Sequence, residues 1–486
     1  MGPKCSEFFQ ITKGVRQGDS ISPLLFSLFV NDLEDFLLSN DYNGLRHLNV
    51  YFSSEFYRRL ESEIKVLVWL YADDTVIFAS DAESLQHGIN CLERYCQSND
   101  LIINTDKTKV LVFESVKDKK RSNIFRYKDQ ILNVADEFIY LGVTFKVNGS
   151  LSETPKNLAL KPSKAMFSVI SNSRRLGLDI PTQVELFKGV IQPILTYGCE
   201  VWGYENINPV EVVQHRYYKY MIKLFPRTPS YMLFGELGEV PINIAIKTKM
   251  ITYWNKMQSS PNHNKLNVLL FNIGKEQFDN GSLISKWYSY IKNEIGKCGL
   301  PGIWNIRNLK SEHLKVVVNQ ILSDQFRQDW FDTINSDKRF ETYKRIKHSH
   351  KFESYFEKLP NYLAINFCRF KLGNLKTDFC KNRNFNDANH TPKTQICHFC
   401  KEDVYLNEFH YLMNCRHFSN SRRTLMPFIN FNRPDIILFE NIFNIQNEEK
   451  LVNISKFCLV VMNALEKVSP GPKRRKRRPA SVQTIA

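Results

Sequence analysis

Two adjacent aspartates, Asp73 and Asp74, separate two apolar, β-rich runs in the segment VLVWLYADDTVIFAS, residues 66–80. This pattern predicts a hairpin whose tight bend carries both carboxylates. The bend lacks the Asn-Gly or Asp-Gly pair that makes hairpin turns easy. Adjacent carboxylates repel each other unless a cation or a proton relieves them, and a divalent ion such as Mg²⁺ suits them because it takes oxygen ligands. The alternative is a solvent-facing acidic turn.

A turn followed by a helix is predicted upstream, within residues 12–38. Ser22 and Pro23 are typical of a helix N-cap and a first helical residue. Apolar residues then recur at helical spacing, at Leu25, Phe29, Leu33 and Phe36.

In the turn ahead of this helix, Gly14 and Gly18 frame the pair Arg16-Gln17. Glycines let a backbone approach a ligand closely, and a helix N-terminus attracts phosphate. A structural turn without a ligand is the simpler interpretation of this segment taken alone.

Downstream of the hairpin, strand and helix patterns alternate. Asp81 is expected to cap a helix, and residues 101–113 to form two strands joined by a polar turn that carries Lys107. Residues 124–145 are predicted to form a further β-ribbon. From Thr182 onward the periodicity is helical, with one apolar face formed by Val184, Phe187, Ile191 and Leu195.

The 486 residues include 66 Lys+Arg and 50 Asp+Glu, which gives a formal net charge of +16. This charge is uneven, because residues 1–150 have a net charge of −4 and residues 151–486 a net charge of +20. A basic half of this kind fits contact with nucleic acid. A solvated basic surface would have the same composition.

At roughly 150 residues per domain, the length predicts about three domains. Hydrophobic residues make up 43% of the chain and aromatic residues 13%, which excludes wholesale disorder. No apolar run approaches the roughly 18 residues of a membrane helix, and the N-terminus lacks the apolar segment of a signal peptide. We therefore expect a soluble, intracellular protein.

Three cysteines and one histidine cluster as Cys397-x2-Cys400-x9-His410-x4-Cys415. Three thiolates and an imidazole suit a closed, tetrahedral structural zinc site. A core histidine without a metal is the alternative for His410. The remaining cysteines are expected to be reduced, because disulfide frameworks belong to short secreted chains.

The segment at residues 469–486 is punctuated by proline and glycine and is predicted to be a disordered tail. Six consecutive basic residues are typical of a nuclear-localisation signal or a phosphate-binding patch. They are Lys473, Arg474, Arg475, Lys476, Arg477 and Arg478. A solvated charge run is the alternative.

The order of these segments resembles the reverse transcriptases of non-LTR (LINE-type) retrotransposons, a class of transposable element. The resemblance rests on the succession GVRQGDSISPLLF, YADD, NTDKTKVLVF, YLGVTF, LTYGCEVWG and GELGEVPI. It covers most of residues 8–250 and resumes near residue 365. It implies an α+β fold, a partial palm of a polymerase right hand with an antiparallel sheet, followed by a helical thumb and connector and a small zinc-binding module.

The resemblance also implies residue roles. Asp73 and Asp74 match the catalytic hairpin, where Mg²⁺ (or Mn²⁺) promotes nucleotidyl transfer to a primer 3′-hydroxyl. Arg16, Gln17 and Gly18 match the turn that lies against the template and the incoming nucleotide. The implied partners are an RNA template, a DNA primer and deoxynucleotides.

Three further matches come from the resemblance. Tyr71 would flank the primer end, and residues 140–145 resemble the primer-grip ribbon. Lys107 corresponds to a cation near the leaving pyrophosphate that could act as a general acid, with a surface lysine as the alternative. Many proteins of this class end in a similar Cys/His segment, from which Glu408 departs slightly in its spacing to His410.

The implied layout has six parts. They are a palm segment (1–150), a thumb-like helical region (151–250), a helical connector (251–365), a zinc-binding-like module (366–430), a C-terminal helical segment (431–468) and the basic tail (469–486).

In this family a first catalytic strand, which ends in another metal-binding aspartate, precedes the RQG segment by several tens of residues. Here 13 residues precede Gly14, and Asp19 and Asp32 lie within the turn and helix themselves. We therefore expect a fragment with little or no polymerase activity. Whether the chain is an enzyme stays open, and the alternatives are a non-catalytic nucleic-acid-binding protein that uses the zinc module and tail, or a decayed fragment.

Overall fold

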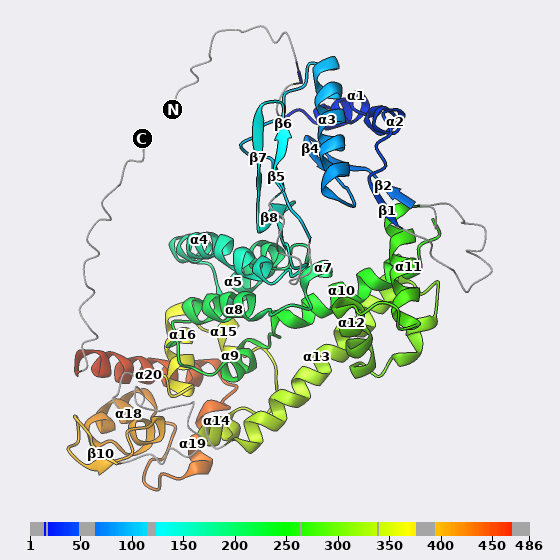
Figure 1. Ribbon diagram of the computed structural model, residues 1–486. Coiled ribbons are helices and arrows are strands. Elements are labelled where there is room, and N and C mark those ends of the chain that lie inside the picture. The colour runs from blue at the N-terminus through cyan, green and yellow to red at the C-terminus, as the bar shows by residue number, and fades with distance from the viewer. Residues whose placement is uncertain are drawn as a thin grey trace, which may run out of the picture. The chain divides into compact units, whose positions relative to one another are not determined.

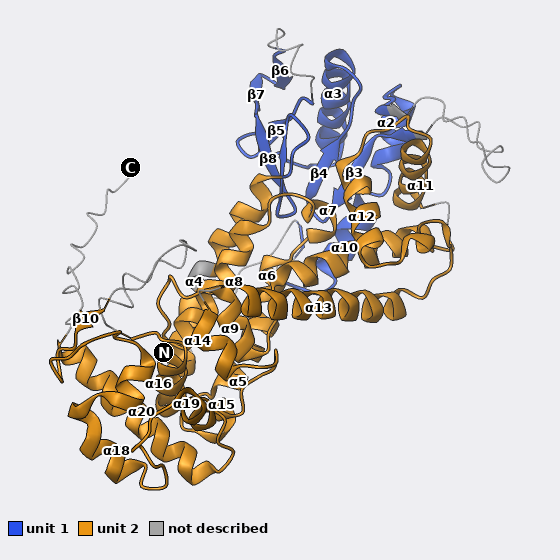
Figure 2. Cartoon of the chain, turned by 90° about the horizontal axis from the view of Figure 1, so that it is seen from below, with its two compact units in different colours: residues 1–151 blue, residues 152–486 orange. Residues whose placement is uncertain are grey.

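The computed structural model describes residues 14–15, 18–47, 64–113, 123–262, 265–337, 340–375 and 394–468. The chain divides into two compact units, Met1–Leu151 and Ser152–Ala486 (Figure 2). Its fold class is α+β, with most strands in the first unit and mainly helices in the second (Figure 1). The predicted residues Arg16 and Gln17, and the basic tail, lie outside the described residues.

The described strands of the first unit form four small sheets. Three are antiparallel pairs, namely β1 (Leu45–His47) with β2 (Ile64–Val66), β3 (Val68–Tyr71) with β4 (Asp74–Ile77), and β8 (Glu137–Tyr140) with β9 (Val143–Lys146). The fourth has β7 (Gln130–Val134) at its centre, antiparallel to β6 (Phe125–Tyr127) and parallel to β5 (Lys109–Val110). The predicted hairpin and ribbon are therefore confirmed as strands.

Two predictions about local structure were wrong. Residues 101–104 form no strand, because they run as irregular backbone into the turn that carries Lys107, and only β5 follows. The helix predicted after the RQG turn is also divided, into α1 (Ser22–Phe29) and α2 (Leu33–Ser39). Ser22 is the first residue of α1 rather than its N-cap, a difference of one position.

The division of that helix changes which side chains it buries. Leu33 is buried in the core, but Leu25 and Phe29 are half-exposed, and α1 buries no residue. The hydroxyl of Tyr95 donates a hydrogen bond of 2.5 Å to the Asp32 carboxylate. This bond ties the beginning of α2 to the helix that follows the hairpin, so the predicted apolar stripe is buried only in its second half.

Helix α3 (Ala82–Ser98) organises the core of the first unit. Asp81 caps it as predicted, because its carboxylate accepts a 2.8 Å hydrogen bond from the backbone N–H of Ser84. One side of α3 contributes Cys91 and Tyr95 to a core shared with α2, and another contributes Ile89 to a core shared with β6 and β7.

The second unit consists mostly of helices (Figure 1). From the N-terminal side these are α4 (Glu153–Arg175), α5 (Ile180–Leu186), η1 (Phe187–Ile191), α6 (Gln192–Leu195), α7 (Cys199–Trp202), α8 (Asn208–Met221), α9 (Ser230–Leu237), α10 (Ile242–Gln258), α11 (Leu266–Asp279), α12 (Lys286–Lys297) and η2 (Pro301–Asn305). There follow α13 (Ser311–Ser336), α14 (Glu341–Ile346), α15 (Tyr355–Lys358), α16 (Asn361–Lys371), α18 (Ser419–Leu425), α19 (Ile436–Phe443) and α20 (Glu448–Val468).

The helical face predicted after Thr182 is buried throughout, at Val184, Phe187, Ile191 and Leu195. The helix begins earlier than predicted, at Ile180, because Asp179 accepts a 2.8 Å hydrogen bond from the N–H of Thr182 and serves as the cap. Its middle, η1, is a π-helix, a wider turn than the α-helical spacing assumes.

A buried ion network joins distant parts of the second unit. Glu236 is fully buried, accepts hydrogen bonds from the hydroxyls of Tyr343 (3.0 Å) and Tyr355 (2.5 Å), and pairs with Lys371 at 3.0 Å. Lys371 also pairs with Glu353 at 3.1 Å. Removing one member of a buried pair leaves an uncompensated charge, at a cost of about 3–5 kcal/mol. The network therefore fixes α9 to α15 and α16.

His350 lies in an aromatic pocket, 5.5 Å from Phe326 and 5.4 Å from Trp330 between ring centroids. Its Nε2 is 3.0 Å from the carbonyl oxygen of Glu239, and no described group partners its Nδ1. Burial lowers the pKa of His350 from 6.5 to about 4. The folded unit therefore holds this imidazole neutral.

We expect the second unit to lose stability as the pH falls from 6.5 to about 4. In this range His350 binds a proton in the unfolded chain but stays neutral in the folded unit. The loss is up to about 3 kcal/mol for this residue. Urea unfolding at several pH values measures it, and His350→Gln is expected to show a shallower pH dependence. The exposed His313→Gln is the matched control, and equal slopes in the two variants would contradict the account.

Candidate functional site

The hairpin of β3 and β4 presents its two aspartates at a two-residue turn. Tyr71 and Asp74 are the last paired residues, so only Ala72 and Asp73 form the loop. Asp74 is thus the first residue of β4, and Asp73 is at the tip. Both carboxylates are exposed, and among the described residues no side chain donates a hydrogen bond to either. A hydrated cation or a phosphate can therefore reach them directly.

The turn is strained at Ala72, whose φ is +52°. Two-residue hairpin turns need a positive φ at the first loop position, where glycine is usual. An L-residue in this left-handed region costs roughly 1–2 kcal/mol. Backbone strain of this kind clusters at functional sites, where the surrounding structure enforces it.

A second hairpin lies close to the first. Tyr140 is the last residue of β8. Burial of its phenol raises the pKa of Tyr140, and the negative charge of the Asp74 carboxylate is the second, smaller cause. The turn between β8 and β9 has a positive φ at both Leu141 and Gly142, as a type I′ turn requires. The Tyr140 phenol, at the start of ribbon 140–145, therefore lies within electrostatic reach of Asp74.

The remaining predicted residues of the first unit are exposed. Gly18 has a φ of +88° with open space where a Cβ would stand. Tyr71 is 63% exposed beside the turn, and Lys107 is an exposed turn residue whose backbone N–H bonds to the Asn104 side chain at 3.1 Å. Asp19 accepts a 3.1 Å hydrogen bond from the N–H of Ile21, a local role that begins α1.

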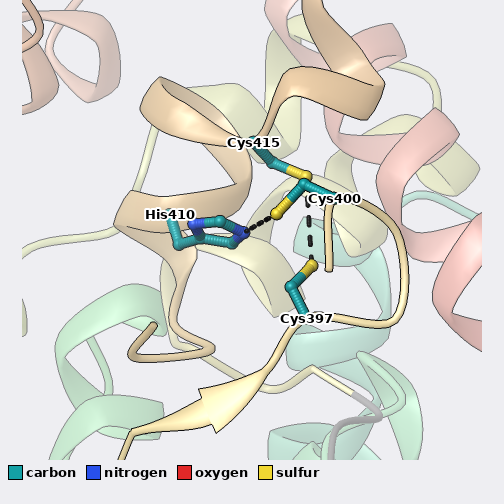
Figure 3. A group of neighbouring side chains, drawn as sticks. All are labelled: Cys397, Cys400, His410 and Cys415. Carbon is teal, nitrogen blue, oxygen red and sulfur yellow. Dashed lines mark hydrogen bonds between the residues drawn. The ribbon is translucent and has the colours of Figure 1, made fainter. Parts of the chain in front are cut away.

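In the second unit, the structure brings the four predicted Cys/His residues together (Figure 3). Their sulfur and nitrogen atoms all lie within 4.8 Å of one another. Cys397 Sγ is 4.0 Å from Cys415 Sγ, and Cys400 Sγ is 3.7 Å from His410 Nε2. The edge of a zinc–thiolate tetrahedron is about 3.8 Å for a Zn–S bond of about 2.3 Å. The cluster therefore has the dimensions of a tetrahedral metal site.

Two local structures build this cluster. Cys397 and Cys400 lie in the turn between β10 (Gln395–Ile396) and β11 (Asp403–Val404). Cys397 donates its N–H to the carbonyl of Glu402 (2.8 Å) and accepts from Lys401 (2.9 Å), and this closes the loop around the thiols.

The other two ligand candidates are placed by the π-helix η4 (His410–Asn414). In an α-helix, five residues turn by about 500°, so His410 and Cys415 would lie about 140° apart around the axis. Here the N–H of Cys415 bonds to the carbonyl of His410 at 2.8 Å, an i→i+5 bond that closes a wider turn. The sequence carried no signal for this π-turn, which brings the two side chains toward one side.

Burial disfavours charge in this cluster. It raises the pKa of the Cys415 thiol to about 12, with the neighbouring Cys397 as a second cause, and it also raises the pKa of Cys400. Burial lowers the pKa of His410. Burial therefore favours the neutral forms of Cys400, His410 and Cys415, and a bound divalent ion would favour the thiolates instead.

Comparisons with known proteins agree on one family. Residues 2–145 match the family described as reverse transcriptase (RNA-dependent DNA polymerase). A second match, 24% identical over 271 residues, is the RNA-directed DNA polymerase from mobile element jockey of Drosophila funebris. The chain is related to the reverse transcriptases of non-LTR retrotransposons. The matched segment contains the aspartate hairpin and the second hairpin up to residue 145.

Two other relatives of this reverse-transcriptase-related chain are also named for mobile elements or transposons. The jockey polymerase of Drosophila melanogaster is 21% identical over 272 residues, and an uncharacterized transposon-derived protein of Caenorhabditis elegans is 29% identical over 136 residues. These matches cover 52% and 28% of the chain. The chain spans 26% of the length of each jockey polymerase and 48% of the worm protein.

None of the described helices of this retrotransposon-related chain is both long and apolar enough to cross a membrane.

Besides the π-turn, two further features of the sites were not predicted from the sequence. The strain at Ala72 could have been suspected, because the turn has no glycine. The guanidinium of Arg422, which bonds to the carbonyl oxygen of Cys415 at 2.7 Å, had no such signal, since nothing in the spacing distinguishes it from Arg423.

We expect Ala72→Gly to stabilise the aspartate hairpin by about 0.5–1 kcal/mol, because glycine removes the left-handed strain but gains freedom in the unfolded chain. Hydrogen exchange of the β3 and β4 amides in the full chain measures the change. Ala82→Gly, at the first residue of α3, is the control and should be destabilising. Equal destabilisation by both variants would show that the turn is unstrained.

Proposed function

We propose that this retrotransposon-derived chain acts on an RNA/DNA primer–template, with Asp73 and Asp74 as ligands of Mg²⁺ (or Mn²⁺) for nucleotidyl transfer. The observation that carries the proposal is the strained two-residue turn, which exposes Asp73 in its loop and Asp74 at the adjoining end of β4. Two bound metal ions promote in-line displacement at a phosphate by stabilising the attacking and leaving oxygens.

The chain's own residues would position the substrates around this turn. Tyr71, exposed opposite Asp74, would stack at the primer end, since aromatic faces bind bases without sequence preference. Ribbon 140–145 would support the primer beside the turn. The exposed Lys107 would donate a proton or a positive charge near the leaving pyrophosphate.

The turn ahead of α1 would contact the nucleotide and template through Arg16, Gln17 and Gly18. Support comes from Gly18, whose positive φ and open surroundings leave its backbone accessible to a ligand.

A basic and aromatic surface on α4 and α8 would bind the nucleic-acid backbone. The Phe167 and Tyr220 rings contact each other at 5.3 Å and are 46% and 48% exposed. Arg174 bonds to the carbonyl of Tyr220 at 2.7 Å, and Arg216 lies one turn before Tyr220 on the same face of α8. We call these residues, with Lys223, the α4–α8 surface.

The helices of this surface are predominantly basic. Residues 154–178 and 212–235 contain nine basic and no acidic side chains, and the acids Glu153 and Glu211 lie in the first turns of α4 and α8. Such a patch attracts phosphates and, with exposed rings between the cations, favours a nucleic acid over an acidic protein. Part of the net charge of +20 of residues 151–486 therefore lies on and around α4 and α8.

The Cys/His cluster would hold a structural Zn²⁺ through Cys397, Cys400, His410 and Cys415. Support comes from the interatomic distances and from the donor set, three thiols and an imidazole, which suits zinc in a closed site. The ion would join the β10–β11 turn to η4.

We retain the six-part layout as part of this proposal, with the palm in the first unit and the thumb, connector, zinc module and C-terminal helices in the second. The basic tail would direct the chain to the nucleus or bind phosphate, because it concentrates six positive charges.

A second candidate function is nucleic-acid binding without catalysis. The α4–α8 surface favours it, since that surface needs neither metal ions nor aspartates to bind a phosphate backbone.

Primer extension on an RNA template tests the catalytic proposal. Any extension by the full chain is expected to require Mg²⁺ and to disappear in Asp73→Ala, because that carboxylate would hold the metal. Extension that survives in Asp73→Ala would refute the assignment. Primer–template binding without extension in either protein would favour the second candidate.

The α4–α8 surface predicts a steep salt dependence of duplex binding. Arg216→Gln with Lys223→Gln is expected to weaken binding and to reduce the log–log salt slope by up to about 2, since each lost phosphate contact contributes about 0.9. Lys256→Gln with Lys286→Gln, an equal change of charge elsewhere in the unit, is the control. The assignment fails if both double variants bind with the wild-type slope.

Metal analysis of the purified full chain tests the zinc site. One zinc per chain is expected, and Cys415→Ser should reduce retention strongly because it removes a thiolate from the closed site. Cys458→Ser, which changes a buried cysteine outside the cluster, should retain zinc. Less than one zinc per wild-type chain would contradict the assignment.

A further inference from the structure

Arg422 of α18 is buried beside the Cys/His cluster, with 5% of its surface exposed. Its Nη2 donates to the carbonyl of Cys415 at 2.7 Å and to the Ser419 hydroxyl at 3.2 Å. Its Nη1 donates to the carbonyls of Tyr411 at 3.4 Å and Leu412 at 3.5 Å. One guanidinium thus donates hydrogen bonds to three backbone carbonyls, two in η4 and one in the residue that follows it.

These carbonyls belong to the segment that positions two of the four ligand candidates. The last carbonyls of a helix lack partners within the helix and need donors from elsewhere. Arg422 supplies those donors, and so holds the end of the π-turn that brings His410 and Cys415 to one side. A planar fork with five N–H groups can reach several acceptors at once, which a lysine ammonium cannot do with the same geometry.

Charge gives Arg422 a second role. A divalent ion held by three thiolates and a neutral imidazole carries one net negative charge, which is costly to bury without compensation. All four hydrogen bonds of Arg422 to described residues go to uncharged oxygens, so its positive charge is not already matched by them. The Arg416 side chain, next to Cys415 in the sequence, is 85% exposed and pairs with Glu402 at 3.2 Å.

We propose that Arg422 is a positioning residue of the metal centre, which fixes the π-turn that carries His410 and Cys415 and offsets the negative charge of the loaded site. This inference rests on the proposed zinc binding. An arginine that only ties α18 to its neighbours would stabilise the empty and loaded protein equally, and its loss would leave metal affinity unchanged.

The test measures zinc affinity of the full chain by competition with a chromophoric chelator, and the absorption spectrum of the Co²⁺-substituted protein. Arg422→Gln is expected to bind zinc about tenfold or more weakly, as is typical for the loss of an outer-shell partner, and to shift the cobalt bands. Arg422→Lys, which keeps the charge without the fork, should recover part of the affinity. Arg423→Gln, an exposed neighbour on the same helix, should match the wild type.

Wild-type affinity and an unchanged cobalt spectrum in Arg422→Gln would overturn the proposal, whatever the thermal stability of that variant. If Arg422→Gln does not fold, Arg422→Lys decides, and wild-type affinity in that variant overturns the proposal. A wild-type chain that binds no zinc would instead refute the proposed zinc site itself, so the two failures are distinguishable.

Discussion

The register of a single hairpin determines where the two adjacent carboxylates of the first unit lie. Because Tyr71 pairs with Asp74, two residues are left for the loop, and the chain must turn through a left-handed Ala72. That constraint places Asp73 at the tip and Asp74 beside it at the start of β4, with both residues exposed to solvent. The unit enforces it through packing, since α3 begins at its Asp81 cap soon after β4 and contributes to both cores. The strain is thus offset by burial elsewhere.

The second unit uses internal polar contacts rather than strands to fix its geometry. Glu236, Lys371 and Glu353 tie α9 to elements more than one hundred residues later in the chain. At the Cys/His cluster, a hairpin turn and a π-turn converge, and Arg422 holds the end of the π-turn. In both places a buried charged side chain bonds to specific partners, since Glu236 accepts from two tyrosine hydroxyls and Arg422 donates to three backbone carbonyls.

Local sequence patterns predicted much of this structure. The Asp73-Asp74 hairpin, the Asp81 cap, the strands between residues 124 and 145, and the buried face from Val184 to Leu195 follow from alternation, helical period and capping chemistry. The Cys/His residues meet as their spacing suggested. The prediction failed where tertiary contacts override the local pattern. Helical period could not show that Asp32 bonds to Tyr95 and that the helix divides, and no spacing rule shows an i→i+5 turn at His410.

The central claim is that Asp73 and Asp74 bind divalent metal ions that act on nucleic acid. Paramagnetic resonance of Mn²⁺, titrated into the full chain with primer–template and a deoxynucleotide, tests it most directly. The account predicts bound Mn²⁺ in the wild type that is lost in Asp73→Asn/Asp74→Asn, while Asp19→Asn, which changes an exposed acid of the same unit with a local structural role, keeps it. Equal Mn²⁺ binding by the wild type and the double variant would contradict the account.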